Sequence, residues 1–352
     1  MTKPWLFPLV LLAACGPITK IPPASVTQIA DEAELQRRTL ISQLLTEEVR
    51  LQRISHQILT RSAWLCGEKN TTRILNAVFV NRHSFGKDHV KATEYFGYDE
   101  RPKVAASGST LEVDDEIVSL AEHTIPSGAE GITTLRHHLN QIDRNTETIT
   151  ATVLRNGQEQ RLEVPLDLAC DYKIGLTARG IINAFADGYS VKVDTGMMRF
   201  LRTDDELALV IGHEIAHNLM GHIPKKWGNF AVGSVLDLAL FLATGYQSSS
   251  FGQMSAQLLN SQGFELEADY VGLYLTAGAG YEIDDAPELW RRMGLFYPEA
   301  VDPKIWSTHP SSSERAASLV LSVQEVKDKL AAGESLIPSD SRLPRKNDGP
   351  VP

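Results

Sequence analysis

Apolar side chains recur every three or four positions early in the chain. Between residues 26 and 65 they include Ile29, Leu40, Leu44, Leu51 and Ile58, and neither Gly nor Pro interrupts the stretch. This spacing places them on one face and predicts a long amphipathic helix. We expect this helix to pack on the body of the protein. The alternative is a separate coiled coil that binds a partner.

The pattern changes to short alternating runs from residue 74 to residue 174. Runs at 77–80, 116–120 and 148–154 are separated by turn residues and predict strands. The dipeptide Asn156-Gly157 predicts a tight hairpin, because both residues accept the positive φ angles of such a turn. The segment is therefore expected to be a small β-rich domain.

This β-rich segment resembles a PDZ domain. The residues that carry the likeness are 111–120, a helical stretch at 132–142, and the runs 152–157 and 162–164. The resemblance implies binding of extended peptide ends by addition of a strand to a sheet edge. No clear Gly-Leu-Gly-Phe-like loop is present, so the domain is expected either to bind peptides or only to position its neighbour.

The pattern of apolar positions is again typical of helices over residues 175–335, interrupted by one predicted hairpin at 184–193. Residues 336–352 are rich in Pro, Ser and charge and are predicted to be a disordered tail. The expected fold class is α+β, with a long helix, then a small β-rich domain, then a mainly helical domain that carries an edge hairpin.

Composition and charge narrow the functional classes. The chain has 352 residues, of which 43% are hydrophobic and 22% charged, enough for two globular domains and an appendage. Its net charge is −10 and no run of five Lys or Arg occurs, which argues against a nucleic-acid partner.

Residues 1–14 have the pattern of a secretory signal peptide. Lys3 precedes an apolar run at 5–14 that is too short to span a bilayer. Leu12-Ala13-Ala14-Cys15 resembles the lipobox of bacterial lipoproteins, which implies cleavage before Cys15 and lipidation of its thiol. Residues 15–25 would then form a tether to a membrane of the bacterial cell envelope, facing the periplasm. Gly16, where Asp would indicate inner-membrane retention, favours the outer membrane.

Cys66 and Cys170 are the cysteines that remain. In an oxidising compartment two such cysteines favour a disulfide, and two unrelated buried thiols are the alternative. The bond would close a loop of roughly 100 residues, for which chain entropy predicts about 4.7 kcal/mol of stabilisation.

A capping box, Thr203 to Glu206, predicts that a helix begins near Asp204. This helix contains His213-Glu214-Ile215-Ala216-His217. Imidazoles four positions apart share a helical face, about 5–6 Å apart at Cβ, and suit two ligands of one tetrahedral zinc. Glu214 projects about 100° away, from where it can act as general base on a zinc-bound water.

A second acidic pair supplies the missing ligand. Glu265 lies 48 residues after His217 and shares a predicted helical face with Asp269. Glu265 is expected to be the third ligand of one zinc ion per chain, with Asp269 accepting the free N–H of a liganding histidine. Glu267 is the rival ligand, and His222 is expected to pack or cap near the end of the zinc-binding helix.

These motifs together resemble the gluzincin peptidases of the CAAX-prenyl-protease and HtpX-like type. The likeness spans residues 174–321 and includes Ser307-Thr308-His309-Pro310 followed by Arg315. It implies a zincin-type peptidase domain in which His309 stabilises the oxyanion or covers the zinc, and in which Arg315 supports the site. It also likens the hairpin at 184–193 to a strand at the edge of the cleft.

The sequence therefore predicts a zinc metalloendopeptidase that cleaves unfolded or misfolded envelope proteins. A lipoprotein chaperone or assembly scaffold with a dormant zinc site is the runner-up, and a non-peptidase metal hydrolase is a third possibility. The apolar segment 230–243 is short and carries Asp237 at its centre, so we expect a core or cleft-lining helix, with contact at a membrane surface as the minority interpretation.

Overall fold

The computed structural model describes residues 19, 21–223, 251–296 and 313–339, without the side chains of 251–261. Four predictions fall outside this part of the chain. They are the signal peptide with the lipidated Cys15, the apolar segment 230–243, the loop that contains His309, and the tail beyond residue 339.

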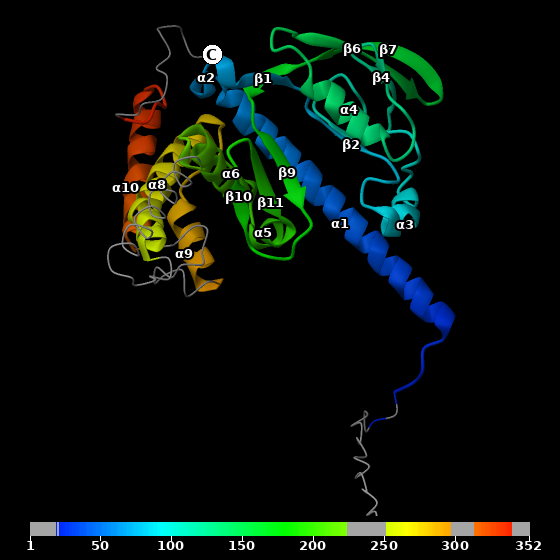
Figure 1. Ribbon diagram of the computed structural model, residues 1–352, viewed down its shortest axis with the longest axis horizontal. Helices are drawn as coiled ribbons and strands as arrows, with labels where there is room; N and C mark the ends of the chain where they lie inside the picture. The colour runs from blue at the N-terminus through cyan, green and yellow to red at the C-terminus, as the bar shows by residue number, and fades with distance from the viewer. Residues whose placement is uncertain (1–18, 20, 224–250, 297–312, 340–352) are drawn as a thin grey trace, which may run out of the picture.

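The described elements combine helices with mostly antiparallel strands, an α+β arrangement (Figure 1). The helices are α1 (Val26–Arg61), α2 (Ala63–Cys66), α3 (Val90–Glu94), α4 (Gly131–Asn140), α5 (Thr195–Phe200), α6 (Asp204–Leu219), α8 (Phe251–Gly278), α9 (Ala286–Phe296) and α10 (Ser313–Ala332). The strands are β1 (Thr71–Ile74), β2 (Ala77–Val80), β3 (Lys103–Ser107), β4 (Glu116–Leu120), β5 (His123–Thr124), β6 (Thr148–Arg155), β7 (Gln158–Pro165), β8 (Asp167–Cys170), β9 (Lys173–Thr177), β10 (Ala184–Ala186) and β11 (Ser190–Asp194).

Helix α1 begins at a capping box, in which Ser25 and Gln28 satisfy each other's backbone N–H groups. The sequence predicts one helix over residues 26–65. The structure instead ends α1 at Arg61, and α2 follows after Ser62. Ile29, assigned to the apolar stripe, is 60% exposed, because the first turns of α1 extend beyond the rest of the molecule (Figure 1).

The second half of α1 lies between two cores and contacts both. Leu51, Ile54 and Ile58 belong to the core of the helical part. Leu45 and Val49 pack against the cluster of Val78, Val80 and Tyr98 beside the larger sheet. Figure 1 shows α1 running diagonally between the sheet and the helices. The helix is thus a shared wall that fixes the position of the two parts relative to each other.

The larger sheet has the order β2-β3-β4-β6-β7, with β5 paired to β4. Asn156 and Gly157 join β6 to β7 with φ angles of 53° and 77°, so the predicted hairpin is confirmed. A separate core beneath this sheet contains Ile117, Leu120 and, from α4, Leu135. The sheet therefore has its own hydrophobic interior, distinct from that of the helical part.

Two connections hold the sheet region to the end of α1. Strands β1 and β8 pair antiparallel, and Cys66 and Cys170 form a disulfide bond with Cα atoms 5.6 Å apart. The bond joins the end of α2 to the end of β8. Chain segments before and after the larger sheet are thereby tied together.

A smaller sheet lies beside α6 and has the order β10-β11-β9. Strands β10 and β11 form the hairpin predicted at 184–193, and β9 runs parallel to β11. Asn218 of α6 holds this hairpin, because its amide donates to the carbonyl of Ser190 and accepts from the N–H of Gly188. Strand β10 therefore lies at the edge of the sheet, directly against the helix that carries the two histidines.

Helices α6 and α8 cross at two glycines. A Cβ atom on Gly212 would lie 2.8 Å from the carbonyl oxygen of Gly272, and one on Gly272 would lie 2.9 Å from the backbone nitrogen of His213. Thr276 reinforces the crossing by donating its hydroxyl to the Ala208 carbonyl. Because only glycine permits this backbone approach, the crossing brings His213 within reach of the acidic side chains of α8.

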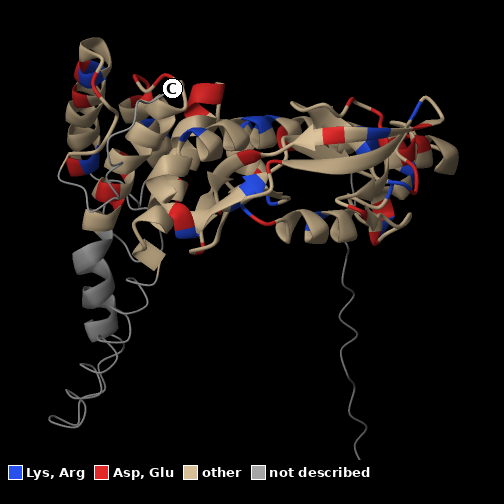
Figure 2. Ribbon diagram, turned by 90° about the horizontal axis from the view of Figure 1, so that it is seen from above, with Lys and Arg blue, Asp and Glu red and all other residues tan. Residues whose placement is uncertain are grey.

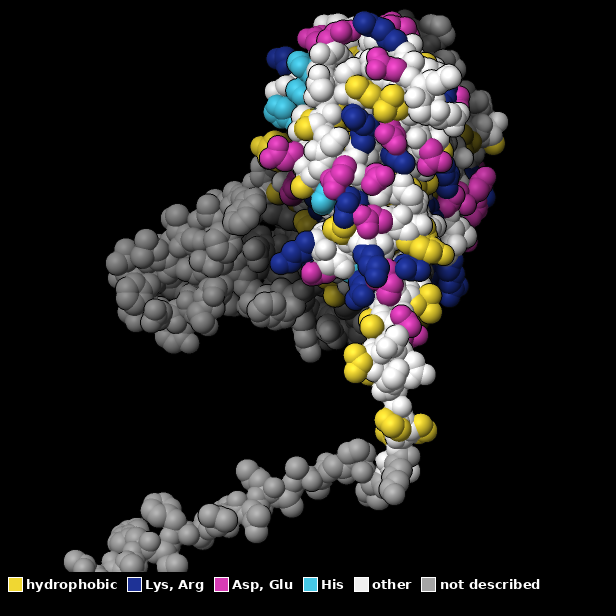
Figure 3. Space-filling view, turned by 90° about the vertical axis from the view of Figure 1, so that its right-hand side faces the viewer, with side chains coloured by type: hydrophobic (Ala, Val, Ile, Leu, Met, Phe, Trp, Pro, Cys, Tyr) yellow, Lys and Arg dark blue, Asp and Glu magenta, His cyan; other side chains and the backbone are white. Residues whose placement is uncertain are grey.

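Seen from above, the helical part and the sheet part lie side by side along the long axis, with acidic and basic residues interleaved over both (Figure 2). The face in Figure 3 likewise mixes Lys and Arg with Asp and Glu. None of the described helices combines the length and the apolarity needed to cross a bilayer.

The first residues of the predicted tail pack on the helical part. Pro338 is buried, Lys329 of α10 donates to the carbonyl of Ile337, and the N–H of Ser339 donates to the hydroxyl of Tyr270. Residues 336–339 are therefore ordered against α8 and α10, because their backbone groups find partners there.

Candidate metal centre

Helix α6 begins where the sequence places it, but its cap differs in one respect. The Thr203 hydroxyl accepts from the N–H of Glu206, as a capping box requires. The Glu206 carboxylate, however, accepts from the N–H of Arg202 and pairs with Arg292 of α9. The expected reciprocal bond to Thr203 is therefore wrong, because the Glu206 carboxylate is instead taken up by the N–H of Arg202 and by the partly buried guanidinium of Arg292.

Three potential ligands converge where α6 faces α8. The Nε2 atoms of His213 and His217 are 3.1 Å apart, and they lie 3.3 Å and 3.5 Å from the nearer carboxylate oxygens of Glu265. All three side chains are almost fully buried. Within the described residues, this is the group of histidine and acidic side chains that is able to hold a metal ion.

The spacing of these atoms fits a tetrahedral zinc site. With metal–ligand bonds of about 2.0–2.1 Å, the corners of a tetrahedron lie about 3.3 Å apart. The two ring nitrogens lie 3.1 Å apart, and the Glu265 carboxylate faces both, with Oε2 3.3 Å from His213 and Oε1 3.5 Å from His217. Two imidazoles and one carboxylate leave the fourth corner open, which is the arrangement of catalytic rather than structural zinc sites.

The buried charge around this centre also fits a divalent cation. Glu214, Glu265 and Asp269 are buried carboxylates, and Arg315 is the buried guanidinium that contacts two of them. A divalent cation held by Glu265 and the two imidazoles would bring further positive charge to these buried carboxylates. Because a buried charge is stable only when it is paired, this set of side chains is compatible with a bound cation.

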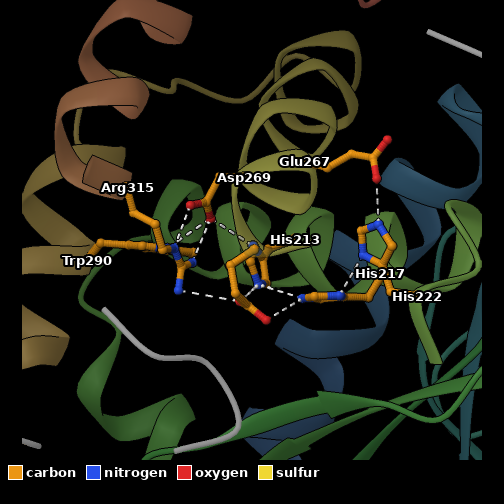
Figure 4. A network of polar contacts seen from close by, with 8 residues as sticks. His213, His217, His222, Glu267, Asp269, Trp290 and Arg315 are labelled. Atoms are coloured by element: carbon orange, nitrogen blue, oxygen red, sulfur yellow. Dashed lines mark hydrogen bonds and ion pairs between the residues drawn. The ribbon is translucent and has the colours of Figure 1, made fainter. Parts of the chain in front are cut away.

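Asp269 holds the first histidine from behind. Its Oδ1 atom lies 2.9 Å from Nδ1 of His213, while Arg315 donates to both of its oxygens at 2.8 Å. Trp290 of α9 donates its indole N–H to the same carboxylate at 2.9 Å (Figure 4). Four elements thus meet at Asp269 and set the direction in which the imidazole of His213 points.

The electrostatics of this pair follow from its contacts. Burial lowers the pKa of His213, but Asp269 and Glu265 outweigh burial and raise it to about 9. Burial raises the pKa of Asp269, but Arg315 and His213 outweigh that effect and hold it below its usual value. The carboxylates around His213 thus favour positive charge at this position.

Three further residues that the sequence analysis singled out lie near this centre. Glu214 is 2% exposed and follows His213 on α6. Glu267, the rival ligand, instead pairs with His222, with 2.8 Å between its Oε2 and Nε2 of that ring. Arg315 contacts Asp269 and Glu265.

Sequence reasoning overlooked Trp290 and the role of His222. Trp290 carries no motif and comes from a helix 21 residues beyond Asp269. His222 was expected to pack or cap, whereas its Nδ1 atom lies 2.9 Å from Nδ1 of His217 (Figure 4). The only available signal was the Gly221-His222 dipeptide just after the zinc-binding helix, since glycine is typical of a helix end that reverses direction.

Comparison with known proteins places this centre in a family context. The model of a protein family described as peptidase family M48 matches residues 144–322. The mitochondrial metalloendopeptidase OMA1 of Arabidopsis thaliana is 34% identical over 143 residues, which are 40% of this chain and 29% of that protein. The metalloprotease LoiP of Escherichia coli is 28% identical over 159 residues, which are 43% of this chain and 60% of that protein.

A third relative is the putative beta-barrel assembly-enhancing protease of Vibrio cholerae, 29% identical over 150 residues that cover 38% of this chain and 31% of that protein. The chain thus spans less than half the length of most of the curated relatives it matches. The matched region contains α6, α8 and Arg315. It therefore includes every described residue of the metal centre.

Proposed function

Since this chain belongs to peptidase family M48, we propose that it is a zinc-dependent endopeptidase of the bacterial cell envelope that hydrolyses internal peptide bonds. The observation that carries the proposal is the cluster of His213, His217 and Glu265, in which two imidazoles and one carboxylate lie close enough together to hold one metal ion.

The proposed chemistry divides between the cation and the chain. Zinc, held by these three residues, would supply a Lewis acid for the hydrolysis. Glu214 accepts the proton of the attacking water and returns it to the leaving amine, as a general base and then a general acid. Asp269 and Arg315 keep the imidazole of His213 directed at the cation. No nucleophilic Ser or Cys takes part.

Strand β10 supplies a place for the substrate backbone. It pairs with β11 on one side, and the hairpin is anchored to α6 through Asn218. A locally unfolded chain adding to this sheet edge would lie extended near α6. This arrangement supports cleavage of unfolded or misfolded proteins, since folded ones expose few extended segments.

The N-terminal half of the chain bears on the location of the protein and on the role of the larger sheet. The lipobox-like residues before Cys15 support a lipid anchor facing the periplasm, with the outer membrane favoured. One relative is named for beta-barrel assembly, which supports misassembled envelope proteins as substrates. The order β2-β3-β4-β6-β7 with helix α4 supports a PDZ-like module over residues 74–174, which either binds peptides or positions the peptidase part.

The subtype within the family is also part of the proposal. The resemblance to the CAAX-prenyl-protease and HtpX-like type rests partly on His309-Pro310, which lies outside the described residues. By that resemblance His309 stabilises the oxyanion or covers the zinc. A His309→Ala variant that retains zinc and loses cleavage would support the first role, and one that cleaves faster would support the second.

The discriminating experiment compares Glu214→Gln with wild type. We expect Glu214→Gln to bind one zinc per chain and to cleave unfolded casein at least about 100-fold more slowly, the contribution of a general base. Glu288→Gln, the same change at an exposed position of α9, is the matched control. Wild-type protein that binds zinc without cleaving casein contradicts the proposal. A phenotype in cells that Glu214→Gln leaves intact would support the scaffold alternative, and cleavage of small esters alone a non-peptidase hydrolase.

A further inference from the structure

His217 contacts the metal centre with one ring nitrogen and a second imidazole with the other. Its Nε2 atom faces His213 and Glu265. Its Nδ1 atom lies 2.9 Å from Nδ1 of His222, and Nε2 of His222 lies 2.8 Å from Glu267 (Figure 4). These contacts form a row of polar groups that runs from the buried metal centre, through the fully buried imidazole of His222, to the Glu267 side chain, which is 41% exposed.

The turn after α6 makes this contact possible. In a continuing helix, residue 222 would point about 140° away from residue 217, since each residue turns about 100°. Instead, α6 ends at Leu219, and Gly221 adopts a φ of +64°, in the left-handed region that glycine tolerates. His222 is thereby directed back toward the end of α6. The ring of Phe264, from α8, stacks on it with centroids 4.6 Å apart and fixes its plane.

The hydrogen-bonding capacities of the three groups leave one consistent arrangement. A ring nitrogen that binds a cation must present its lone pair, so the proton of neutral His217 lies on Nδ1. The facing Nδ1 of His222 must then accept it, which places the proton of His222 on Nε2. The Glu267 carboxylate, an acceptor when ionised, receives that proton's hydrogen bond. Glu267 thus sets the tautomer of His222, and His222 sets that of His217.

We propose that His222 and Glu267 are positioning residues that fix the tautomer and the ring orientation of His217 for metal binding. The two liganding imidazoles are then held by different means. Asp269, paired with Arg315, holds His213, and an imidazole–carboxylate pair holds His217. The inference rests on the proposed zinc site. Partners of this kind affect metal affinity by about 10–100-fold.

The test measures zinc affinity of the metal-stripped full chain by competition with a chromophoric chelator. We expect His222→Ala to weaken zinc binding about 10–100-fold. Glu267→Ala should weaken it in the same direction, and Glu267→Gln should restore part of the loss, because its amide oxygen accepts the hydrogen bond without the charge. Since Glu267 is half-exposed, its variants remain informative should His222→Ala fail to fold.

A matched control exists in the same chain. His56 of α1 and Asp167 of β8 form an imidazole–carboxylate pair, 3.1 Å apart, with a similarly buried ring and exposed carboxylate, on elements that supply no ligand. His56→Ala and Asp167→Ala should leave zinc affinity unchanged within about twofold. Thermal midpoints of all metal-free variants separate loss of folding from loss of binding.

Cobalt substitution supplies a readout that a merely structural role would not change. Co²⁺ bound at the site should give visible absorption typical of a tetrahedral centre in wild type and in the control pair. In His222→Ala and Glu267→Ala the band should shift or weaken as the ring of His217 reorients. Wild-type zinc affinity and an unchanged cobalt spectrum in both variants would overturn this inference alone. A wild-type chain that binds no zinc would overturn it together with the proposed function.

Discussion

Replacing Arg315 with methionine tests the electrostatic design of the site most sharply. The guanidinium is 2% exposed, donates to both oxygens of Asp269 at 2.8 Å, and lies 3.4 Å from Glu265. Its removal takes away the guanidinium that pairs with the buried Asp269 carboxylate and lies next to the buried Glu265. Breaking a buried ion pair in this way costs about 3–5 kcal/mol.

The expected result is a large loss of stability in metal-free protein. For a unit of about 150–250 residues, each kcal/mol corresponds to about 2–4 °C, so the thermal midpoint should fall by roughly 6–20 °C. Saturating zinc should recover part of the loss, because a ligand at 100 times its Kd adds about 2.7 kcal/mol. Calorimetry with and without zinc measures both effects.

A double-mutant cycle provides the control. Asp269→Asn removes the charge that Arg315 balances, so the double variant Asp269→Asn/Arg315→Met should be more stable than the sum of the single losses predicts. We expect a coupling energy toward the upper end of the usual range of about 0.5–3 kcal/mol. Arg315→Met within about 0.5 kcal/mol of wild type, or strictly additive losses, would refute the electrostatic reasoning.

Three further predictions concern the turn after α6, the disulfide and the larger sheet. An alanine at position 221 would have space for its Cβ atom but would have to adopt a φ of +64°. Gly221→Ala should therefore lower the free energy of unfolding by about 1–2 kcal/mol and weaken zinc binding. An unchanged free energy of unfolding together with unchanged zinc affinity would contradict the account of that turn. Cys66→Ser with Cys170→Ser should lower stability by up to about 4.7 kcal/mol in denaturant titrations, and no loss would show that the bond constrains nothing. Burial raises the pKa of Asp115, but its hydrogen bonds with Arg155 and with the N–H of Glu112 outweigh burial and lower this pKa below 3.8. Its contribution to stability is therefore present above pH 3.8 and is lost as pH falls through the lowered pKa, so the destabilisation by Asp115→Asn in denaturant titrations should be largest at neutral pH and should decrease progressively in acid; a loss that does not change with pH would contradict this.

Local sequence signals were sufficient for several features. Asn156-Gly157 predicts its hairpin because few dipeptides accept two positive φ angles. Thr203 predicts the start of α6 because its hydroxyl satisfies an orphan backbone donor. The spacing of His213 and His217 predicts that their rings lie on one face, because residues four apart are neighbours on a helix surface. These signals depend on neighbours within a few residues, which the sequence displays directly.

The remaining features depend on contacts between distant segments. Trp290 donates to Asp269, and Arg292, 86 residues from Glu206 in the sequence, pairs with that carboxylate in place of the predicted bond to Thr203. Neither Trp290 nor Arg292 lies in a recognisable sequence pattern. The bridging position of α1 depends on two cores that are visible only after folding. His222 turns back because one glycine takes a left-handed conformation, which the dipeptide permits but does not dictate.

Zinc stoichiometry in matched acidic variants tests the central claim most directly. Metal-stripped wild type, Glu265→Gln and the exposed-site control Glu288→Gln would be loaded with excess zinc, desalted and assayed by elemental mass spectrometry. Wild type and Glu288→Gln should retain one zinc per chain at protein concentrations above Kd, whereas Glu265→Gln should retain much less, because it lacks the third ligand. Wild type without zinc, or Glu265→Gln with undiminished zinc affinity, would contradict the account.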